Sequence, residues 1–157
     1  MKGDKLRAHY QIKELAKQHE VYLFCLNYKD EEEKAKEELS KYCKTIHIEK
    51  LNLFSSLLRV CFSVFSFVPF QTAYYNSPKA KKYFKAFVKR NNIELCYFQF
   101  VRLAPFAKKI KRKKVLDFQD TLSMNMKRRA DNSGLLQRVL FSIEAKRLAR
   151  YESKMFE

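Results

Sequence analysis

Apolar side chains follow two different periods along the chain. Residues 4–18 carry them at helical spacing, and Gly3 with Asp4 is expected to form the turn and N-cap that open this helix. The continuous apolar run of residues 21–26 instead predicts a strand buried on both faces of a parallel sheet. Both patterns recur downstream. Helices are expected over 31–42, 53–70, 78–90, from about 102, 121–131 and 134–155, and strands over 45–48, 95–100 and 115–118.

This alternation predicts an α/β fold with one Rossmann-like parallel sheet and helices on both of its faces. The 157 residues suffice for one domain with a sizeable core. In such sheets, ligands bind at the carboxyl ends of the strands. The loops after residues 26, 49, 100 and 118 are therefore the expected binding loops.

Residues 53–70 are mostly apolar, and their polar positions recur at close to helical spacing. Pro69 is expected to end this helix. Eighteen residues with Arg59 near the middle span a bilayer only marginally, because a spanning helix needs about 20 apolar residues. Two interpretations stay open: burial against the sheet, or an interfacial helix on an anionic membrane with Arg59, Phe62 and Phe65 facing the lipid.

The positive charge is concentrated in the second half. The net charge is +16, and residues 79–157 hold 21 basic and 7 acidic side chains, a net of +14. Such a field favours polyanions: nucleic acid, an anionic bilayer or phosphorylated small molecules. Nucleic acid is disfavoured because the aromatic residues lie in apolar runs and do not interleave with Lys and Arg. The basic run 108–114 is interpreted as a solvated surface turn.

The four cysteines are widely spaced, without a C-x-x-C pair, and are expected to be buried free thiols in the reducing cytoplasm. No charged segment followed by an apolar run opens the sequence, so no secretory signal is expected.

Several segments, in order, resemble the N-terminal, acceptor-side domain of family 4 glycosyltransferases. The opening Gly3-Asp4-Lys5-Leu6-Arg7-Ala8 is similar to the first loop and helix of that domain. The other similar segments are Pro69-Phe70-Gln71 with Tyr74-Tyr75, residues 99–105, residues 116–123, Arg128-Arg129-Ala130, residues 143–147 and Arg150-Tyr151-Glu152.

The resemblance implies a retaining enzyme with the two-domain GT-B fold that builds cell-surface polysaccharide or glycolipid. It implies a sugar nucleotide held mainly by the C-terminal domain, a glycan or lipid-linked acceptor held by this one, and no metal or other cofactor. Its location would be cytoplasmic, at the inner face of the plasma membrane. The sequence departs from this family in two ways. It lacks the strand expected ahead of Gly3, and it lacks the C-terminal domain. A half-enzyme that is inactive alone and poorly soluble is therefore expected.

Candidate site residues lie at helix starts and strand ends. Backbone N–H groups at Gly3 and Asp4, helped by Arg7, are candidates for facing the donor phosphates; the alternatives are a plain N-cap and a solvated arginine. Gln99 and Arg102 bracket a strand end, where polar side chains are expected to project into the acceptor cleft, and an arginine there can clamp a phosphate in a bidentate manner or pair locally.

A second group follows the last expected strand. Asp117, Asp120 and Ser123 are candidates for lining the acceptor cleft. Asp120 is interpreted as the N-cap of the next helix, with orientation or deprotonation of an acceptor hydroxyl as the catalytic alternative.

Glu144 and Glu152 have the E-x7-E spacing of an acidic pair known from retaining glycosyltransferases. That pair belongs to the C-terminal domain, whereas these two residues share one basic helix, about 80° apart around its axis. Surface ion pairs with nearby lysines and arginines are expected for both.

Overall fold

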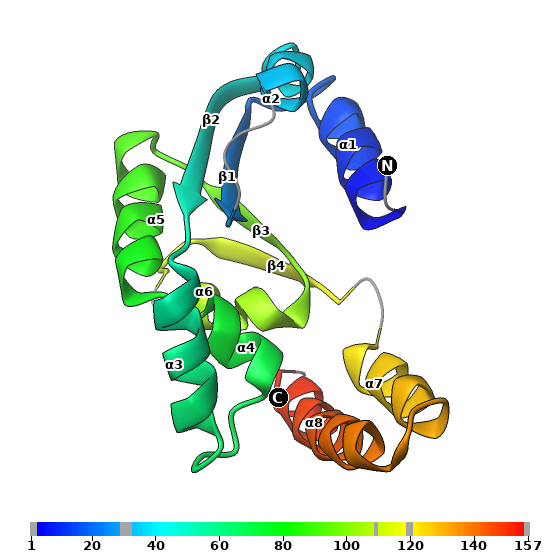
Figure 1. The fold of residues 1–157 in the computed structure, drawn as a ribbon. Helices are drawn as coiled ribbons and strands as arrows, with labels where there is room; N and C mark the ends of the chain where they lie inside the picture. The colour runs from blue at the N-terminus through cyan, green and yellow to red at the C-terminus, as the bar shows by residue number, and fades with distance from the viewer. Residues whose placement is uncertain (1–2, 29–32, 109, 119–120, 156–157) are drawn as a thin grey trace. The chain divides into compact units, whose positions relative to one another are not determined.

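The computed structural model describes residues 3–28, 33–108, 110–118 and 121–155 (Figure 1). Its contacts divide the chain into two compact units, Met1–Asn52 (unit 1) and Leu53–Glu157 (unit 2). Each unit combines helices with a two-stranded parallel sheet. The predicted α/β class is therefore confirmed, but the described strands form two small sheets, not a single one.

Unit 1 consists of α1 (Gly3–Leu15), β1 (Val21–Asn27), α2 (Glu33–Ser40) and β2 (Cys43–Lys50). The two strands are parallel, with Leu23 opposite Ile46, and α2 supplies the crossover that a parallel pair requires. Every residue of β1 is partly exposed, so the prediction of a strand buried on both faces is wrong here. Among the strands that the structure describes, β1 is hydrogen-bonded to β2 alone, so its other edge is open.

Unit 2 contains the second sheet and most of the helices. The strands β3 (Leu95–Gln99) and β4 (Lys113–Asp117) pair in parallel, with Tyr97 opposite Val115 and Gln99 opposite Asp117. The helices are α3 (Leu53–Ser63), α4 (Phe70–Tyr75), α5 (Pro78–Arg90), η1 (Val101–Leu103), α6 (Ala104–Ala107), α7 (Leu122–Asp131) and α8 (Leu135–Ser153). The boundaries of α5, α7 and α8 lie within two residues of those expected from the sequence.

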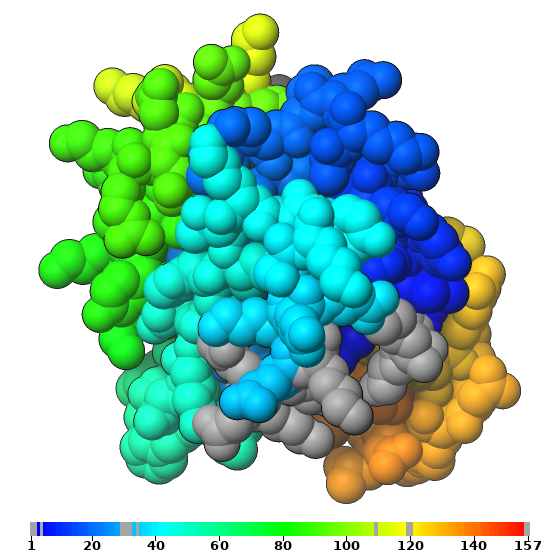
Figure 2. Space-filling view, turned by 90° about the horizontal axis from the view of Figure 1, so that it is seen from above, coloured from blue at the N-terminus to red at the C-terminus, as the bar shows by residue number. Residues whose placement is uncertain are grey.

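One face of the β3–β4 sheet is covered. The Phe84 ring of α5 makes edge contacts with Phe98 of β3 and Phe106 of α6, and Phe87 and Cys96 are buried. On the strands' other face, Leu95, Tyr97 and Val115 are exposed. The lysines of α5 at 79, 82, 85 and 89 are exposed, and side chains of the green segment that carries this helix protrude in Figure 2.

A second cluster joins the end of β3 to the helical hairpin of α7 and α8. Val101 of η1 is fully buried with Leu122 and Met126 of α7 and Leu148 of α8. Because this cluster includes the residue two positions after the end of β3, packing of the hairpin fixes the path of the chain as it leaves the strand.

The helix expected over 53–70 is shorter than expected, and a separate helix begins at residue 70. Helix α3 ends at Ser63, and Pro69 occupies the N-cap position of α4. The hydroxyl groups of Ser63 and Ser66 donate to the carbonyls of Val60 and Ser63. Such local bonds compete with helix continuation, and the proline has no N–H to offer. The helix therefore breaks several residues before the proline that was expected to end it.

The polar stripe of α3 faces the interior of unit 2. Ser56 is fully buried, and Arg59 donates from Nε to the Ala73 carbonyl at 3.3 Å and from Nη2 to the Tyr74 carbonyl at 3.1 Å. Arg59 thus caps the carboxyl end of α4. The prediction that Arg59 faces lipid is therefore wrong. The alternative prediction, that the apolar face is buried against the sheet, is also wrong, because Phe62 and Phe65 are 72% and 92% exposed.

The expected surface ion pairs of Glu144 and Glu152 are also wrong, since both side chains are buried. Glu144 accepts hydrogen bonds from the backbone N–H groups of Phe70 and Gln71, at 2.8 and 2.9 Å. Glu152 accepts from the hydroxyl of Ser123 at 2.6 Å and from its N–H at 3.3 Å. Each carboxylate of α8 therefore caps the amino end of another helix, α4 or α7.

Three of the four cysteines are at least partly buried, as expected, and Cys61 is an exception because it is exposed on α3. Burial raises the pKa of the Cys25 thiol to about 11, with a smaller contribution from neighbouring Cys43. None of the helices in the described residues is long and apolar enough to cross a membrane.

Candidate functional site

The carboxyl ends of β3 and β4 lie side by side, as the sequence predicts for a ligand-binding edge. Gln99 and Asp117 are partners in the register, and the N–H of Phe100 donates to the Asp117 carbonyl at 2.7 Å. The Tyr97 hydroxyl donates to a carboxylate oxygen of Asp117 from the exposed face of the sheet. Two candidates from different segments, Gln99 and Asp117, are thus brought together.

The chain leaves β3 through an unusual backbone conformation at Phe100, with φ 75° and ψ 138°. A positive φ in a bulky residue other than glycine costs about 1–3 kcal/mol and is typical of functional sites. This residue starts the turn into η1 and thereby directs the following side chains. This conformation could not be predicted from the sequence, because no glycine marks the position.

Arg102 of η1 lies across two aromatic rings. Its guanidinium carbon is 4.3 Å from the ring centroid of Phe100 and 4.8 Å from that of Tyr75 on α4. Cation–π stacking of this kind holds the flat group by its faces and leaves its N–H edge available. Within the described part of the chain, the Arg102 side chain forms no hydrogen bond or ion pair.

A guanidinium held in this way is suited to an anion with two adjacent oxygens, such as a phosphate or a carboxylate. The rings restrict its rotamers in advance, so that less conformational entropy is lost on binding. Of the candidates named from the sequence, Arg102 has the geometry that best fits its predicted role.

Helix α4, which supplies Tyr75 and packs against η1, also carries two buried polar atoms without a partner in the described structure. They are Oγ1 of Thr72 and Oδ1 of Asn76, one helical turn apart. Buried polar atoms normally have a hydrogen-bond partner, and a water molecule or a ligand hydroxyl can fill that role. Sequence reasoning missed both residues because neither belongs to a recognisable motif.

The remaining candidates lie elsewhere. Ser123 is buried in α7 and its hydroxyl is bonded to Glu152, so it does not line an acceptor cleft. The N-cap of α7 is Thr121, whereas Asp120 lies outside the described residues. In unit 1, α1 already begins at Gly3, so Asp4 belongs to the helix and not to the N-cap.

Gly3 is exposed, and nothing lies within 4 Å of the position that a Cβ would occupy there. Close packing therefore does not require a glycine. Arg7 is exposed on the same helix. The side chain of Asp4 is outside the described part, so the predicted phosphate-facing role of this segment stays a prediction.

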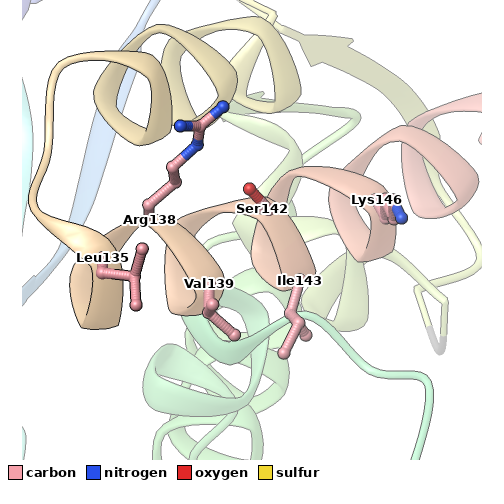
Figure 3. A pocket seen from close by; sticks show the side chains of 6 residues that line it. All are labelled: Leu135, Arg138, Val139, Ser142, Ile143 and Lys146. Atoms are coloured by element: carbon pink, nitrogen blue, oxygen red, sulfur yellow. The ribbon is translucent and has the colours of Figure 1, made fainter.

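A shallow hollow lies along α8, away from the Arg102 site. Leu135, Val139 and Ile143 follow one another on one side of the helix, and Arg138, Ser142 and Lys146 complete the lining (Figure 3). In the described segments, no three His, Cys, Asp or Glu side chains are grouped closely enough to hold a metal ion.

Comparison of the chain with protein-family models, curated proteins and solved structures finds no match. The functional conclusion consequently depends on the residues of this chain and on the resemblance described above.

Proposed function

We propose that this chain is the acceptor-binding half of a retaining glycosyltransferase that uses a sugar nucleotide to build a cell-surface polysaccharide or glycolipid. The ordered series of similar segments supports the enzyme family, and the anion-binding geometry of Arg102 supports the site. Because the resemblance implies that a separate domain holds the sugar nucleotide, residues 1–157 alone are expected to transfer no sugar.

The strand pairing supports a Rossmann-like fold for this half. In the common doubly wound order 3-2-1-4-5, strands 2 and 3 pair on one side of strand 1, and strands 4 and 5 pair on the other. The pairs β1–β2 and β3–β4 match these two outer pairs in order and in direction. A strand ahead of α1, which the resemblance implies, would be strand 1 in this order.

The observation that carries the proposal is Arg102, stacked on Phe100 and Tyr75 at the carboxyl edge of β3 and β4. A phosphate group of the bound substrates is the expected anion, because the guanidinium fork matches two of its oxygens. Gln99 and Asp117 end the adjacent strands, at the edge where ligands bind in such sheets, and acceptor hydroxyls are the groups proposed to lie there. No metal or other cofactor is part of this proposal.

Titration with inorganic pyrophosphate, followed by calorimetry or by NMR, tests this site. Arg102→Gln is expected to weaken binding about tenfold or more, since a charge-assisted bidentate contact is lost. Arg102→Lys is expected to weaken it nearly as much, because a lysine cannot present the planar fork. The control is Arg138→Gln on α8, which should leave binding unchanged. Equal affinities for the wild type and both Arg102 variants would refute the proposed role.

Sugar transfer is the second test. Measurable transfer from any nucleotide sugar by purified residues 1–157 would contradict the proposal that these residues supply only the acceptor-binding half. A peripheral location at the inner face of the plasma membrane belongs to the same proposal, because the acceptor class is membrane-linked. The alternative is a basic module that binds a membrane or a nucleic acid without catalysis, and it is favoured by the net charge of unit 2, where 22 basic and 7 acidic side chains give +15.

A further inference from the structure

Unit 2 exposes a continuous run of large apolar side chains on α3 and on the turn that follows it. We call this set the outer apolar surface. Its members are Leu53, Phe54, Leu57, Leu58, Phe62, Val64, Phe65 and Phe67, all at least 43% exposed. Single exposed apolar residues are common, but a contiguous apolar patch is typical of a binding surface.

The fold holds this surface outward through specific contacts. The polar stripe of α3 is occupied inside unit 2, where Ser56 accepts from Arg59 and Arg59 also donates to the carboxyl end of α4. Rotating α3 to bury its apolar face would remove these bonds and leave the α4 carbonyls without their donor, which is unfavourable for buried acceptors. The apolar face is therefore the outer face of the folded unit.

Arg147 of α8 fixes the turn that carries Val64, Phe65 and Phe67. Its Nη1 donates to the carbonyls of Ser63 at 2.9 Å and Val68 at 3.4 Å, and its Nη2 donates to the carbonyl of Val64 at 3.0 Å. The guanidinium also lies 4.5 Å from the Phe70 ring centroid. One side chain thus caps the end of α3 and sets the shape of the turn.

The surface continues along α8. At 3.6 residues per turn, Leu136, Leu140 and Ile143 lie within about 40° of Arg147 around the axis of this helix. All three are exposed, at 79%, 52% and 41%. Because Arg147 contacts the turn directly, these side chains extend the outer apolar surface from the turn toward the amino end of α8.

The segments that carry the surface expose no carboxylate. Residues 53–93 contain no Asp or Glu, and the two glutamates of α8 are buried as helix caps. Exposed Lys146 lies one helical turn beyond Ile143 on α8 (Figure 3). Such an apolar surface, on a unit with a net charge of +15, is complementary to anionic lipid headgroups above acyl chains.

We propose that the outer apolar surface docks on an anionic lipid bilayer, with α3 lying in the headgroup plane and Phe62, Phe65 and Phe67 inserted toward the acyl chains. This inference rests on the peripheral location proposed above and not on the sugar-transfer chemistry. It specifies which surface meets the lipid and by which side chains.

Sedimentation with vesicles of phosphatidylcholine alone, and of phosphatidylcholine with one third phosphatidylglycerol, tests the docking. The wild type should bind the anionic vesicles and bind the neutral ones at least about tenfold more weakly. Phe62→Ser combined with Phe65→Ser should lower binding to anionic vesicles about tenfold or more, since each inserted ring contributes apolar area. The control is Met124→Ser, which removes an apolar side chain of α7 that is also exposed and should leave binding unchanged.

The electrostatic part has its own pair of variants. Lys146→Gln should weaken binding to anionic vesicles about fivefold and leave binding to neutral vesicles unchanged. The matched control is Lys13→Gln on α1. A polarity-sensitive label on exposed Cys61 should shift to the blue when the wild type binds anionic vesicles, because the label then leaves water.

Equal binding of the double phenylalanine variant and the wild type, with both folded by circular dichroism, would overturn the proposal. So would tight binding to a single-stranded oligonucleotide without binding to vesicles, which would assign the basic charge to nucleic acid. Pyrophosphate titration of the same preparations separates the two proposals. A wild type that binds pyrophosphate but not anionic vesicles overturns only the docking, and a wild type that binds the vesicles but not pyrophosphate overturns only the Arg102 site.

Discussion

Replacing each buried glutamate of α8 by glutamine should have unequal effects on stability. Glu144 receives two backbone N–H groups, which can only donate. Glu152 receives one N–H and the Ser123 hydroxyl, and a hydroxyl can also accept. A glutamine offers one acceptor oxygen and one amide donor. Glu152→Gln can therefore keep both contacts, because the Ser123 hydroxyl can accept from the glutamine NH2 group instead of donating. In Glu144→Gln, the NH2 group faces a backbone N–H, and neither of these groups can accept.

The magnitudes follow from these partners. Leaving one buried donor of α4 unsatisfied in Glu144→Gln costs about 1–3 kcal/mol. Part of that cost is offset because the buried carboxylate is itself destabilised: desolvation raises the pKa of Glu144, while the hydrogen bonds from Gln71 and Phe70 and the charge of Arg147 lower it by less. We expect a net loss of about 1–2 kcal/mol for Glu144→Gln and below about 1 kcal/mol for Glu152→Gln at pH 7.

Urea unfolding monitored by circular dichroism measures both losses, provided that the m-value stays constant among the variants. If both glutamates formed exposed ion pairs instead, each replacement would lower the free energy of unfolding by less than about 1 kcal/mol. Equal losses, or a larger loss for Glu152→Gln, would refute the argument that the difference lies in which partners can accept. The matched control is Glu14→Gln, whose side chain pairs with Lys17 on the surface of α1 and should change stability little.

Further predictions concern titration, thiol reactivity, helix capping and the sheet. The pKa of Glu144 is raised in the folded state, so its protonation favours folding. The difference in free energy of unfolding between the wild type and Glu144→Gln should therefore be greatest at acidic pH and shrink as the pH rises through the folded-state pKa. Urea unfolding from pH 4 to 7 measures this difference, and a difference that grows with pH would contradict the prediction. With a thiol reagent at pH 7, exposed Cys61 should react first and Cys25, whose pKa is raised to about 11, far more slowly; fast labelling of Cys25 in the folded protein would contradict its burial. Arg59→Met should lower the free energy of unfolding by about 2 kcal/mol because the α4 carbonyls lose their donor, and a loss below about 0.5 kcal/mol would place Arg59 on the surface after all. An apolar strand of about six residues fused ahead of Met1 should raise Tm by about 3 °C or more, whereas the same strand with a central proline should not; equal melting temperatures would count against the doubly wound order.

Local signals in the sequence were enough to place several elements. Residues 78–90 form a helix as expected, because Ser77 accepts from the Ala80 N–H as N-cap and Pro78 occupies the first turn. The apolar run at 95–100 predicted β3 to within one residue. It also placed Gln99 and Arg102 at the carboxyl end of that strand, where the candidate anion site lies.

The site itself was only partly predictable. Arg102 was named from its position after a strand, but its rigidity comes from Tyr75, which is 27 residues earlier in the chain and lies on another helix. No residue type signals the positive φ of Phe100, which begins the turn to Val101 and its contacts with α7 and α8. Such features depend on contacts between segments, which local patterns do not encode.

The periodicity of side chains therefore determined which segments are helices and strands, and it located the polar stripe on α3 and the acidic pair on α8. It did not determine which face of either helix is inside. A periodic pattern is equally compatible with both orientations, and the choice is made by partners distant in the sequence: the α4 carbonyls 14 and 15 residues from Arg59, and the α4 N–H groups more than 70 residues from Glu144. Tertiary structure decided that these charges are internal caps and that the phenylalanines of α3 face outward, because unpaired charges and helix ends cost more to bury than apolar side chains cost to expose.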